Sequence, residues 1–418
     1  MSAPHTPYQS LRRLLRYASE YSRRIKLAAT CSVLNKLFDL APPALIGAAV
    51  DVVVKQDESL IAKLGVTSIM GQLWILAGLT ILIWALESTF EYIATVMWRN
   101  LAQDLQHGVR LDAYVHVQDM DMARLEDEST GGLMSVLNDD INQLERFLDG
   151  GADNLIQVTT TVVLIGIAFF YFSPVIAVLS FVPVPVVLWG SFRFQNRIAP
   201  RYGVVRERVG ILNGQLSNNL HGIATIKSFA TERFEEGRIR RESKAYVDAN
   251  REAIRLSSAF SPLIRMVIVC GFTATLVYGG HQVDQGTLEV GSYSVLVFLT
   301  QRLLWPLTRL GETFDLYQRA MASTDRVLNL LAVPNQIRDG SKAISPAEVR
   351  GEIRFQDIRF VYPNGTRVVD GLSLTMPAGQ TTAIVGSTGS GKSTLVKLLL
   401  RFYDPQSGQV TLDGIRLD

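Results

Sequence analysis

The chain has 418 residues, of which 48% are hydrophobic and 19% are charged, and its mean hydropathy is +0.18. This composition is more apolar than a soluble globular protein requires and predicts membrane-spanning segments. The formal net charge of +2, with basic residues clustered between apolar runs, argues against a nucleic-acid binder with a continuous basic face. The two cysteines and five histidines show no metal-ligand spacing, so we expect neither a zinc site nor a disulfide framework.

The first predicted element is an amphipathic helix at the N-terminus, in residues 1–24. Leu11, Leu14 and Leu15 share one helical face, and arginines surround them. This pattern is typical of a helix that lies on the cytoplasmic leaflet of a membrane. A cleavable signal peptide does not fit, because the following apolar run is long enough to span a bilayer, and a transit peptide is the alternative interpretation.

Six apolar stretches can each cross the hydrocarbon core of a bilayer, which requires about 20 residues. They are residues 25–54, 73–98, 155–172, 175–194, 259–279 and 291–310. Only Ser173 and Pro174 separate the third stretch from the fourth, so these two spans are predicted to form a hairpin. Lysine and arginine are absent from the Ser173 turn and from residues 280–290 but frequent at the opposite ends of the spans, so both termini are expected to be cytoplasmic.

Several polar side chains interrupt the apolar spans. They are Asn35, Asp39, Glu87, Glu91 and Arg265. Ionisable groups are costly in lipid, so each is expected to face a cavity, to pair with another polar group, or to lie in an interfacial extension of its helix. For Asp39 and Glu87 we favour a cavity.

Two long segments between spans, residues 99–154 and 197–258, carry apolar residues at helical spacing among many charges. This pattern predicts that the spans continue as helices well beyond the membrane. Neither segment sustains a heptad repeat, which argues against the alternative of an independent coiled coil. We expect these stalks to contact a cytoplasmic domain.

The sequence pattern changes after the sixth span. Turn residues in 332–341 mark a linker, and the alternation in residues 352–362 predicts a β-strand. The turn formers of 363–365 and 370–371 are predicted to separate further strands. Residues 381–385 are predicted to form a short buried strand.

The segment Gly386-Ser-Thr-Gly-Ser-Gly-Lys-Ser-Thr394 matches the phosphate-loop pattern G-x-x-x-x-G-K-[ST], between that strand and a predicted helix. Its glycines let the backbone turn, so that successive N–H groups and the helix N-terminus face phosphate oxygens. Lys392 is predicted to reach the β- and γ-phosphates, and the Ser393 hydroxyl to bind Mg²⁺. The candidate residues that bind ATP are Gly386, Ser387, Thr388, Gly389, Ser390, Gly391, Lys392, Ser393 and Thr394.

Six spans followed by this loop resemble the type I ABC exporter family, in which a transmembrane domain and a nucleotide-binding domain share one chain. Tyr362 is similar in position to the aromatic residue that stacks on adenine in the family. Residues 222–232 resemble its second coupling helix, and residues 130–135 lie in the region of the first. The domains that the resemblance implies are an all-α six-helix transmembrane domain at 25–318, a linker at 319–350, and the first part of an α/β P-loop NTPase domain at 351–418.

The resemblance implies ATP-driven export by a multi-pass protein of the bacterial plasma membrane, with ATP and Mg²⁺ as cofactors. The expected partners are the lipid bilayer, a second half-transporter subunit and an unidentified lipid, drug or peptide-like substrate, but no nucleic acid. A homodimer is expected, with a heterodimer as the alternative. The family's hydrolytic motifs do not occur before Asp418, so we expect a fragment without catalytic residues and without ATPase activity. An ATP-sensing membrane regulator, or a membrane protein that only binds nucleotide, is the alternative function.

Overall fold

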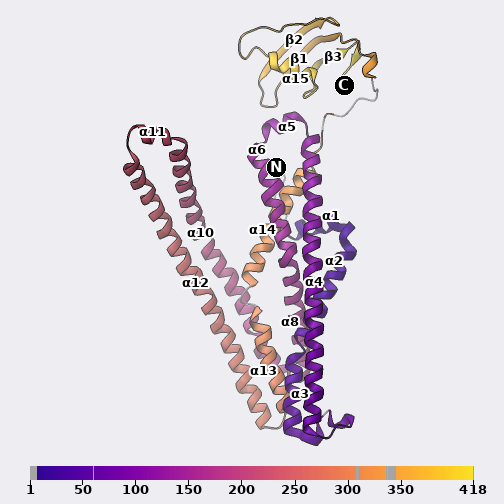
Figure 1. The fold of residues 1–418 in the computed structure, drawn as a ribbon, viewed down its shortest axis with the longest axis vertical. Helices are drawn as coiled ribbons and strands as arrows, with labels where there is room; N and C mark the ends of the chain where they lie inside the picture. The colour runs from indigo at the N-terminus through magenta and orange to yellow at the C-terminus, as the bar shows by residue number, and fades with distance from the viewer. Residues whose placement is uncertain (1–6, 60, 307–309, 336, 338–344, 418) are drawn as a thin grey trace. The chain divides into compact units, whose positions relative to one another are not determined.

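The computed structural model describes residues 7–59, 61–306, 310–335, 337 and 345–417. The chain divides into two compact units, which we describe separately (Figure 1). Unit 1 contains residues 1–18, 103–145 and 319–418, and unit 2 contains residues 19–102 and 146–318. Each unit is therefore assembled from segments that lie far apart in the sequence.

The described residues contain five helical runs that are long and apolar enough to cross a membrane, and one shorter apolar helix. The long runs are Tyr8–Lys55, Ile69–Asp119, Thr130–Phe172, Pro174–His221 and Glu232–Asp284, and the shorter helix is α13, Val290–Leu304. Each long run contains one of the first five predicted spans, and α13 covers most of the sixth. Residues 307–309 of the sixth predicted span lie outside the described part of the chain. The predicted set of membrane helices is confirmed.

The first span is broken near its middle, in contrast to the continuous helix that we expected. Helix α2 (Ser22–Asp39) ends with the N–H of Leu40 bonded to the carbonyl of Lys36 at 3.1 Å, and α3 (Pro42–Lys55) begins two residues later. Pro42 and Pro43 occupy the first turn of α3, where the missing N–H of proline costs nothing. In the interior of a helix the same prolines would remove hydrogen bonds and clash with the preceding turn, which explains the break.

The remaining helices of unit 2 follow the predicted order. They are the first part of α4 (Ile69–Asp119), α8 (Ala152–Phe172), α9 (Pro174–Phe181), α10 (Pro183–His221), α11 (Ile223–Ser228), α12 (Glu232–Asp284) and α13, with short helical turns at Gln56–Glu58 and Ala62–Leu64. The hydroxyl of Ser173 accepts a hydrogen bond from the N–H of Ile176 at 3.4 Å and so caps α9. The predicted hairpin between α8 and α9 is therefore present.

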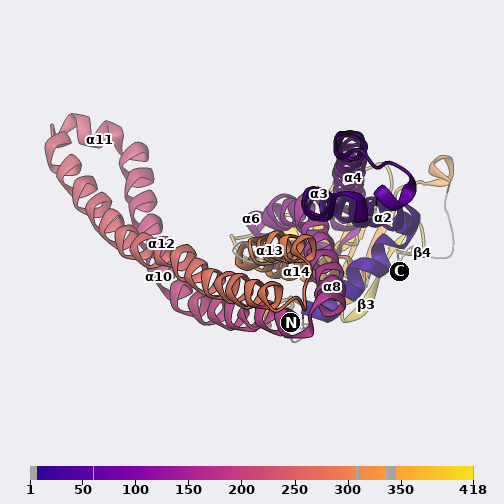
Figure 2. The same ribbon diagram turned by 90° about the horizontal axis from the view of Figure 1, so that it is seen from below.

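The core of unit 2 lies where α8, α9, α10, α12 and α13 pack together. Phe169 and Leu296 are fully buried there, and the hydroxyls of Ser180 and Thr275 form a buried hydrogen bond of 2.8 Å. From this core, α10 and α12 run side by side to the short helix α11 that joins them (Figures 1 and 2). Helices α10 and α12 are 39 and 53 residues long, which exceeds the roughly 20 residues that a bilayer core requires.

The helices of unit 1 are α1 (Pro7–Tyr17), the end of α4, α5 (Met122–Asp127), α6 (Thr130–Met134) and the part of α14 (Leu310–Leu331) after residue 318. A one-turn π-helix at Ser135–Asp140 precedes α7 (Ile141–Arg146), and a second at Phe147–Gly151 follows α7 at the start of a segment of unit 2. The predicted N-terminal helix is present, and one face of it packs on α14, where Ser10 and Arg13 both bond to Asp325. Asp140 is similarly held by Ser323, at 2.9 Å, and by Arg326.

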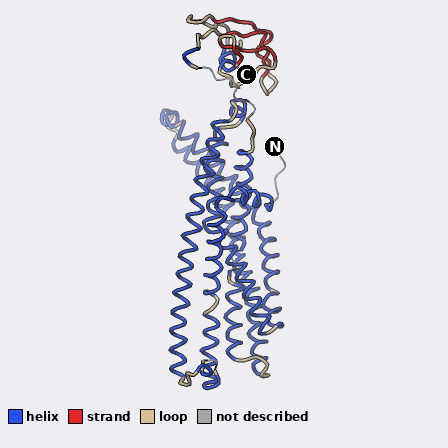
Figure 3. Tube along the Cα trace, turned by 90° about the vertical axis from the view of Figure 1, so that its right-hand side faces the viewer, coloured by secondary structure: helices blue, strands red, loops and turns tan. Residues whose placement is uncertain are grey.

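Unit 1 ends in a small antiparallel sheet with the strand order β2-β1-β3-β4. The strands are β1 (Ile353–Val361), β2 (Arg367–Met376), β3 (Ser407–Leu412) and β4 (Ile415–Arg416), preceded by a helical turn at Pro346–Glu348. Phe355 pairs with Leu374 of β2 and with Val410 of β3. Helix α15 (Lys392–Leu399) contributes Leu395 and Leu398 to the core beneath the sheet. In Figure 3 the strands gather in this part of the chain and helices make up almost all of the rest.

Two expectations about this region are wrong. Asp370 and Gly371 lie inside β2, where Gly371 has a φ of +73° and is the extra residue of a β-bulge opposite Ile358. Residues 381–385 form no strand, and Val385 is 88% exposed. A strand requires a hydrogen-bonded neighbour, and none of the four described strands pairs with this segment.

Candidate functional site

The predicted phosphate loop, residues 386–394, leads directly into α15. Gly391 has a φ of +89° and forms the N-cap of this helix, and Gly389 has a φ of +87°. Both values lie in the left-handed region that non-glycine residues rarely adopt. The loop residues 386–390 are exposed. The glycines therefore shape an exposed turn at the start of a helix.

Two of the glycines also lack the space for a side chain. A Cβ atom on Gly386 would lie 2.7 Å from the Oγ atom of Ser390, and one on Gly391 would lie 2.8 Å from a methyl group of Val368. Both separations are shorter than a Cβ atom tolerates. Glycine at position 391 therefore lets the loop lie against Val368 of β2, and glycine at position 386 leaves room for the Ser390 side chain.

Lys392 reaches back over the loop. Its Nζ atom donates to the carbonyl oxygens of Gly386 at 2.9 Å and Ser387 at 2.6 Å. The ammonium group of Lys392 thus lies against the backbone at the start of the loop. The Ser393 side chain is exposed. A mobile cation above a glycine-rich helix N-terminus fits the charge of a phosphate chain, and the Ser393 hydroxyl is a suitable oxygen donor for Mg²⁺.

Tyr362, the candidate adenine-stacking residue, is half-buried beside α15. Its ring meets those of Phe360 and Tyr403 edge-on, with centroids 4.9 and 5.3 Å away, and the Nζ atom of Lys397 lies 5.6 Å from its centroid. Its hydroxyl is 3.1 Å from the hydroxyl of Thr394 at the end of the loop. The structure therefore brings Tyr362 to the predicted loop and adds a hydroxyl contact that the sequence did not suggest.

A contact between α5 and α15 was not predicted. Lys397 donates to one carboxylate oxygen of Glu126 at 2.6 Å, and the hydroxyl of Tyr403 donates to the other at 2.8 Å. Ala123 of α5 also packs against the core beneath the sheet. The helix that begins at the phosphate loop is therefore fastened to the segment that follows α4.

This contact perturbs both charged partners. Hydrogen bonds from Lys397 and then Tyr403 lower the pKa of the Glu126 carboxyl below its ordinary value. The hydrogen bond to Glu126 raises the pKa of the Lys397 ammonium. Both shifts favour the charged forms, so the pair is ionised at neutral pH. The sequence contained only a weak signal for it, because an exposed lysine on a helix is usually solvated.

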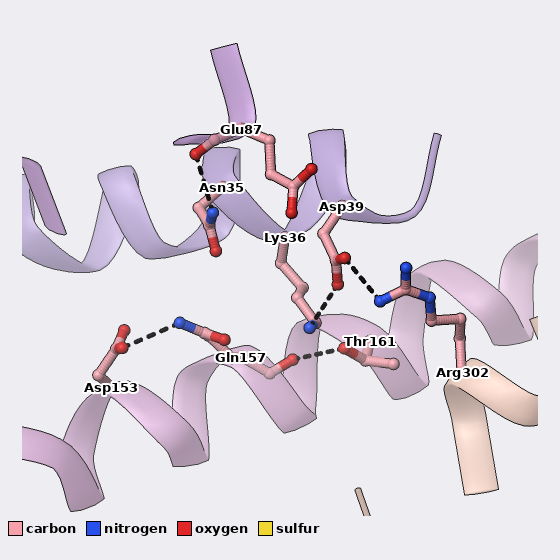
Figure 4. A network of polar contacts seen from close by, with 8 residues as sticks. All are labelled: Asn35, Lys36, Asp39, Glu87, Asp153, Gln157, Thr161 and Arg302. Carbon is pink, nitrogen blue, oxygen red and sulfur yellow. Dashed lines mark hydrogen bonds and ion pairs between the residues drawn. The ribbon is translucent and has the colours of Figure 1, made fainter. Parts of the chain in front are cut away.

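A second polar cluster lies in unit 2, among the residues that interrupt the spans (Figure 4). The Asp39 carboxylate accepts hydrogen bonds from Lys36 at 2.6 Å and from Arg302 at 2.8 Å, and Asn35 donates to the backbone oxygen of Glu87 at 3.1 Å. Asp39 is 8% exposed and lines a cavity, as we favoured. Glu87 does not line that cavity, although Figure 4 shows its carboxylate directed toward the space beside Asp39 and Lys36.

The sequence interpretation missed Lys36 and Arg302 as members of this cluster. Arg302 carried a usable signal, because it is an ionisable residue inside the sixth predicted span. The other polar interruptions have different surroundings. Arg265 lies 5.7 Å from the ring centroid of Trp305, and Glu91 is exposed.

Comparisons with known proteins identify two regions of the chain. The family model of the ABC transporter transmembrane region matches residues 25–307, and the ABC transporter model matches residues 369–418. An uncharacterized ABC transporter ATP-binding protein of Bacillus subtilis, YknV, is 27% identical over 96% of this chain and 65% of its own length. An ATP-dependent lipid A-core flippase of Syntrophus aciditrophicus is 24% identical over 96% of this chain and 65% of its own length.

A solved structure of a bacterial Atm1-family ABC exporter with ATP bound has the same fold, with a TM-score of 0.71 and 21% identity, covering 95% of this chain and 68% of that one. The chain spans about 65% of the length of the two curated relatives. The transmembrane match alone extends over more than half of the chain. The chain therefore belongs to the ABC transporter family and joins a membrane region of the exporter fold to an ATP-binding region on one polypeptide.

Proposed function

We propose that this chain is a subunit of an ATP-driven exporter of the bacterial plasma membrane, with both termini in the cytoplasm. The distribution of lysine and arginine supports the orientation, because the Ser173 turn and residues 280–290 lack both residue types. The family match supports the multi-pass membrane location and the binding of ATP.

The observation that carries the proposal is the contact of Glu126 with Lys397 and Tyr403. Lys397 lies on α15, whose N-terminus is the phosphate loop, and Glu126 lies on α5, which begins three residues after α4 ends. A shift of α15 on nucleotide binding would thus act on the end of a membrane helix. This link is what an ATP-driven change of the membrane region requires.

We assign nucleotide binding to residues 386–394, with Lys392 on the phosphates and Ser393 on Mg²⁺, and adenine stacking to Tyr362. Mg²⁺ would neutralise phosphate charge, while the chain's own backbone N–H groups and Lys392 orient the phosphates. We assign residues 1–24 to an interfacial helix, 25–318 to the transmembrane domain, 319–350 to a linker, and 351–418 to the nucleotide-binding domain.

A second subunit, most simply an identical one, would complete the transporter. Its substrate is a lipid, drug or peptide-like molecule, and the name of the lipid A-core flippase shows that a similar protein moves a lipid. A 418-residue chain expressed alone is expected to show no hydrolysis that depends on Lys392. The physical reason is that no strand supports residues 381–385 ahead of the loop, so the phosphate cradle is not held in place.

Transport by the protein as its native cells produce it tests the proposal. Proteoliposomes would receive external ATP and, in turn, a fluorescent phospholipid, a fluorescent cationic dye and a fluorescent peptide. We expect ATP-dependent movement of at least one probe, and Lys392→Ala should abolish it. ATP binding without movement of any probe would contradict the exporter and favour the ATP-sensing regulator.

A further inference from the structure

Unit 2 contains a cavity of about 590 Å³ beside the break between α2 and α3. Its wall is formed by the end of α2, the start of α3, the last third of α12 and the second half of α13. Cavities that hold small organic ligands have volumes of about 300–1,000 Å³, so this one can hold a molecule of that size.

The residues that line the cavity include three charged side chains, two of them positive and one negative. Asp39 lies between Lys36 and Arg302 and pairs with both (Figure 4). The Asp39 and Lys36 side chains are 11% and 18% exposed, whereas that of Arg302 is 49% exposed. The cation that remains accessible is therefore Arg302.

Arg302 has bonding capacity beyond its pair with Asp39. A guanidinium group carries five N–H donors, and among the described residues Arg302 uses only Nη1, toward Asp39. A planar fork of this kind binds carboxylate and phosphate oxygens in pairs. Glu87 does not line the cavity, although its carboxylate lies close enough to Asp39, Lys36 and Arg302 to interact with them electrostatically.

The rest of the wall is largely apolar. Ile46, Val269, Phe272, Phe298 and Trp305 contribute to it. Aliphatic and aromatic walls favour burial of an apolar chain or ring, at roughly 25 cal/mol per Å² of apolar surface. One end of the cavity is thus charged and the remainder suits hydrocarbon.

We propose that this cavity binds an amphiphile with one anionic headgroup, of the carboxylate or phosphate type, and an apolar tail. The headgroup pairs with Arg302, and the tail lies against Phe272, Phe298 and Trp305. The substrate class of the exporter is then amphipathic anions, so this inference rests on the proposed function.

Fluorescence provides a direct test without ATP. The probes are a conjugated 18-carbon polyene fatty acid, its uncharged methyl ester, and an alkylammonium cation with the same chain. Energy transfer from tryptophan to the polyene reports proximity, and the difference between the wild type and Trp305→Phe isolates the signal at the cavity. We expect the acid to bind about tenfold more tightly than the ester, which corresponds to ~1.4 kcal/mol, and the cation to bind most weakly.

Two substitutions in the same ion pair should act in opposite directions. Arg302→Gln removes the accessible cation and should abolish the preference for the acid over the ester, whereas Arg302→Lys should keep most of it. Asp39→Asn removes the competing carboxylate and should strengthen binding of the acid severalfold. Loss of folding would weaken binding of the acid in both Arg302→Gln and Asp39→Asn. Weaker binding in the first and stronger binding in the second therefore identify an effect of charge.

Equal binding of acid and ester by the wild type, or preferential binding of the cation, would overturn the proposal whatever the variants do. Because these measurements use no nucleotide, their outcome is independent of the transport test. If the protein transports one of the fluorescent probes but shows no preference for the acid in the binding test, only the proposed substrate class is refuted.

Discussion

Replacing Glu126 by glutamine should loosen the contact between α5 and α15. The substitution keeps the shape of the side chain but removes the negative charge that accepts hydrogen bonds from Lys397, at 2.6 Å, and Tyr403, at 2.8 Å. Besides this contact, Ala123 of α5 packs against the core beneath the sheet. The contact should therefore open more often in the variant, with little change in the rest of the fold.

The expected size follows from the exposure of the partners. The side chains of Glu126 and Lys397 are 34% and 29% exposed, which places the pair between a surface ion pair, worth ~0.2–1 kcal/mol, and a hydrogen bond to a charged group in a buried site, worth ~1.5–3 kcal/mol. We expect a coupling free energy of about 1 kcal/mol, or roughly a fivefold change in the opening equilibrium.

A double-mutant cycle isolates the coupling free energy between Glu126 and Lys397. Hydrogen exchange of the α5 amides would be compared in the wild type, Glu126→Gln, Lys397→Met and the double variant. Glu352→Gln is a matched control, because Glu352 pairs with Arg354 on the sheet at 2.8 Å. The control should leave exchange in α5 unchanged. Additive effects of the two single substitutions would refute the contact.

The same pair predicts a dependence on pH. The lowered pKa of Glu126 stabilises the contact above the unfolded-state value of about 4.3, and this contribution is lost as the pH falls through the folded-state pKa. The raised pKa of Lys397 contributes below about 10.4 and is lost as the pH rises through the folded value. Exchange in α5 should therefore be slowest between these limits and independent of pH in the double variant, after correction for intrinsic exchange rates.

Three further predictions concern the nucleotide site and the topology. Tyr362→Ala should weaken binding of a fluorescent ATP analogue by about 1 kcal/mol, and Tyr362→Phe by less, because only the hydroxyl contact with Thr394 is lost; equal losses would refute stacking. Gly391→Ala should reduce binding of the analogue at least tenfold, because the φ of +89° strains alanine and its Cβ atom meets Val368; unchanged affinity would show that the loop tolerates another shape. A cysteine introduced at the exposed Gln285 should react with an impermeant thiol reagent in intact cells, and its protection, while a cysteine in an inner loop reacts, would refute the orientation.

Much of the fold could be predicted from the local sequence pattern. The hydrophobic spans, the alternation in 352–362 and the glycine spacing of 386–394 each depend on neighbours within a few residues, so the sequence alone predicted them. The break in the first span had a local signal as well, in the pair Pro42 and Pro43, which we did not use. The strand expected at 381–385 failed because a strand depends on partners elsewhere in the chain, and local pattern cannot supply them.

The ion pairs in the two sites could not be predicted from the local sequence pattern. Arg302 is separated from Asp39 by 263 positions, and Lys397 from Glu126 by 271. Each pair forms because helices distant in sequence pack together. A single sequence shows which residues are charged, but not which of them meet.

Access to the cavity from the two sides of the membrane tests the central claim, that ATP at the loop drives a change in the membrane region. Phe298, which lines the cavity, would be replaced by cysteine in a protein with Cys31→Ser and Cys270→Ser, and its reaction with an impermeant thiol reagent would be followed from each side. We predict reaction from the cytoplasmic side without ATP, reaction from the outer side with ATP and Mg²⁺, and no switch when Lys392→Ala is added. Reactivity that stays on one side in every nucleotide state would contradict the account.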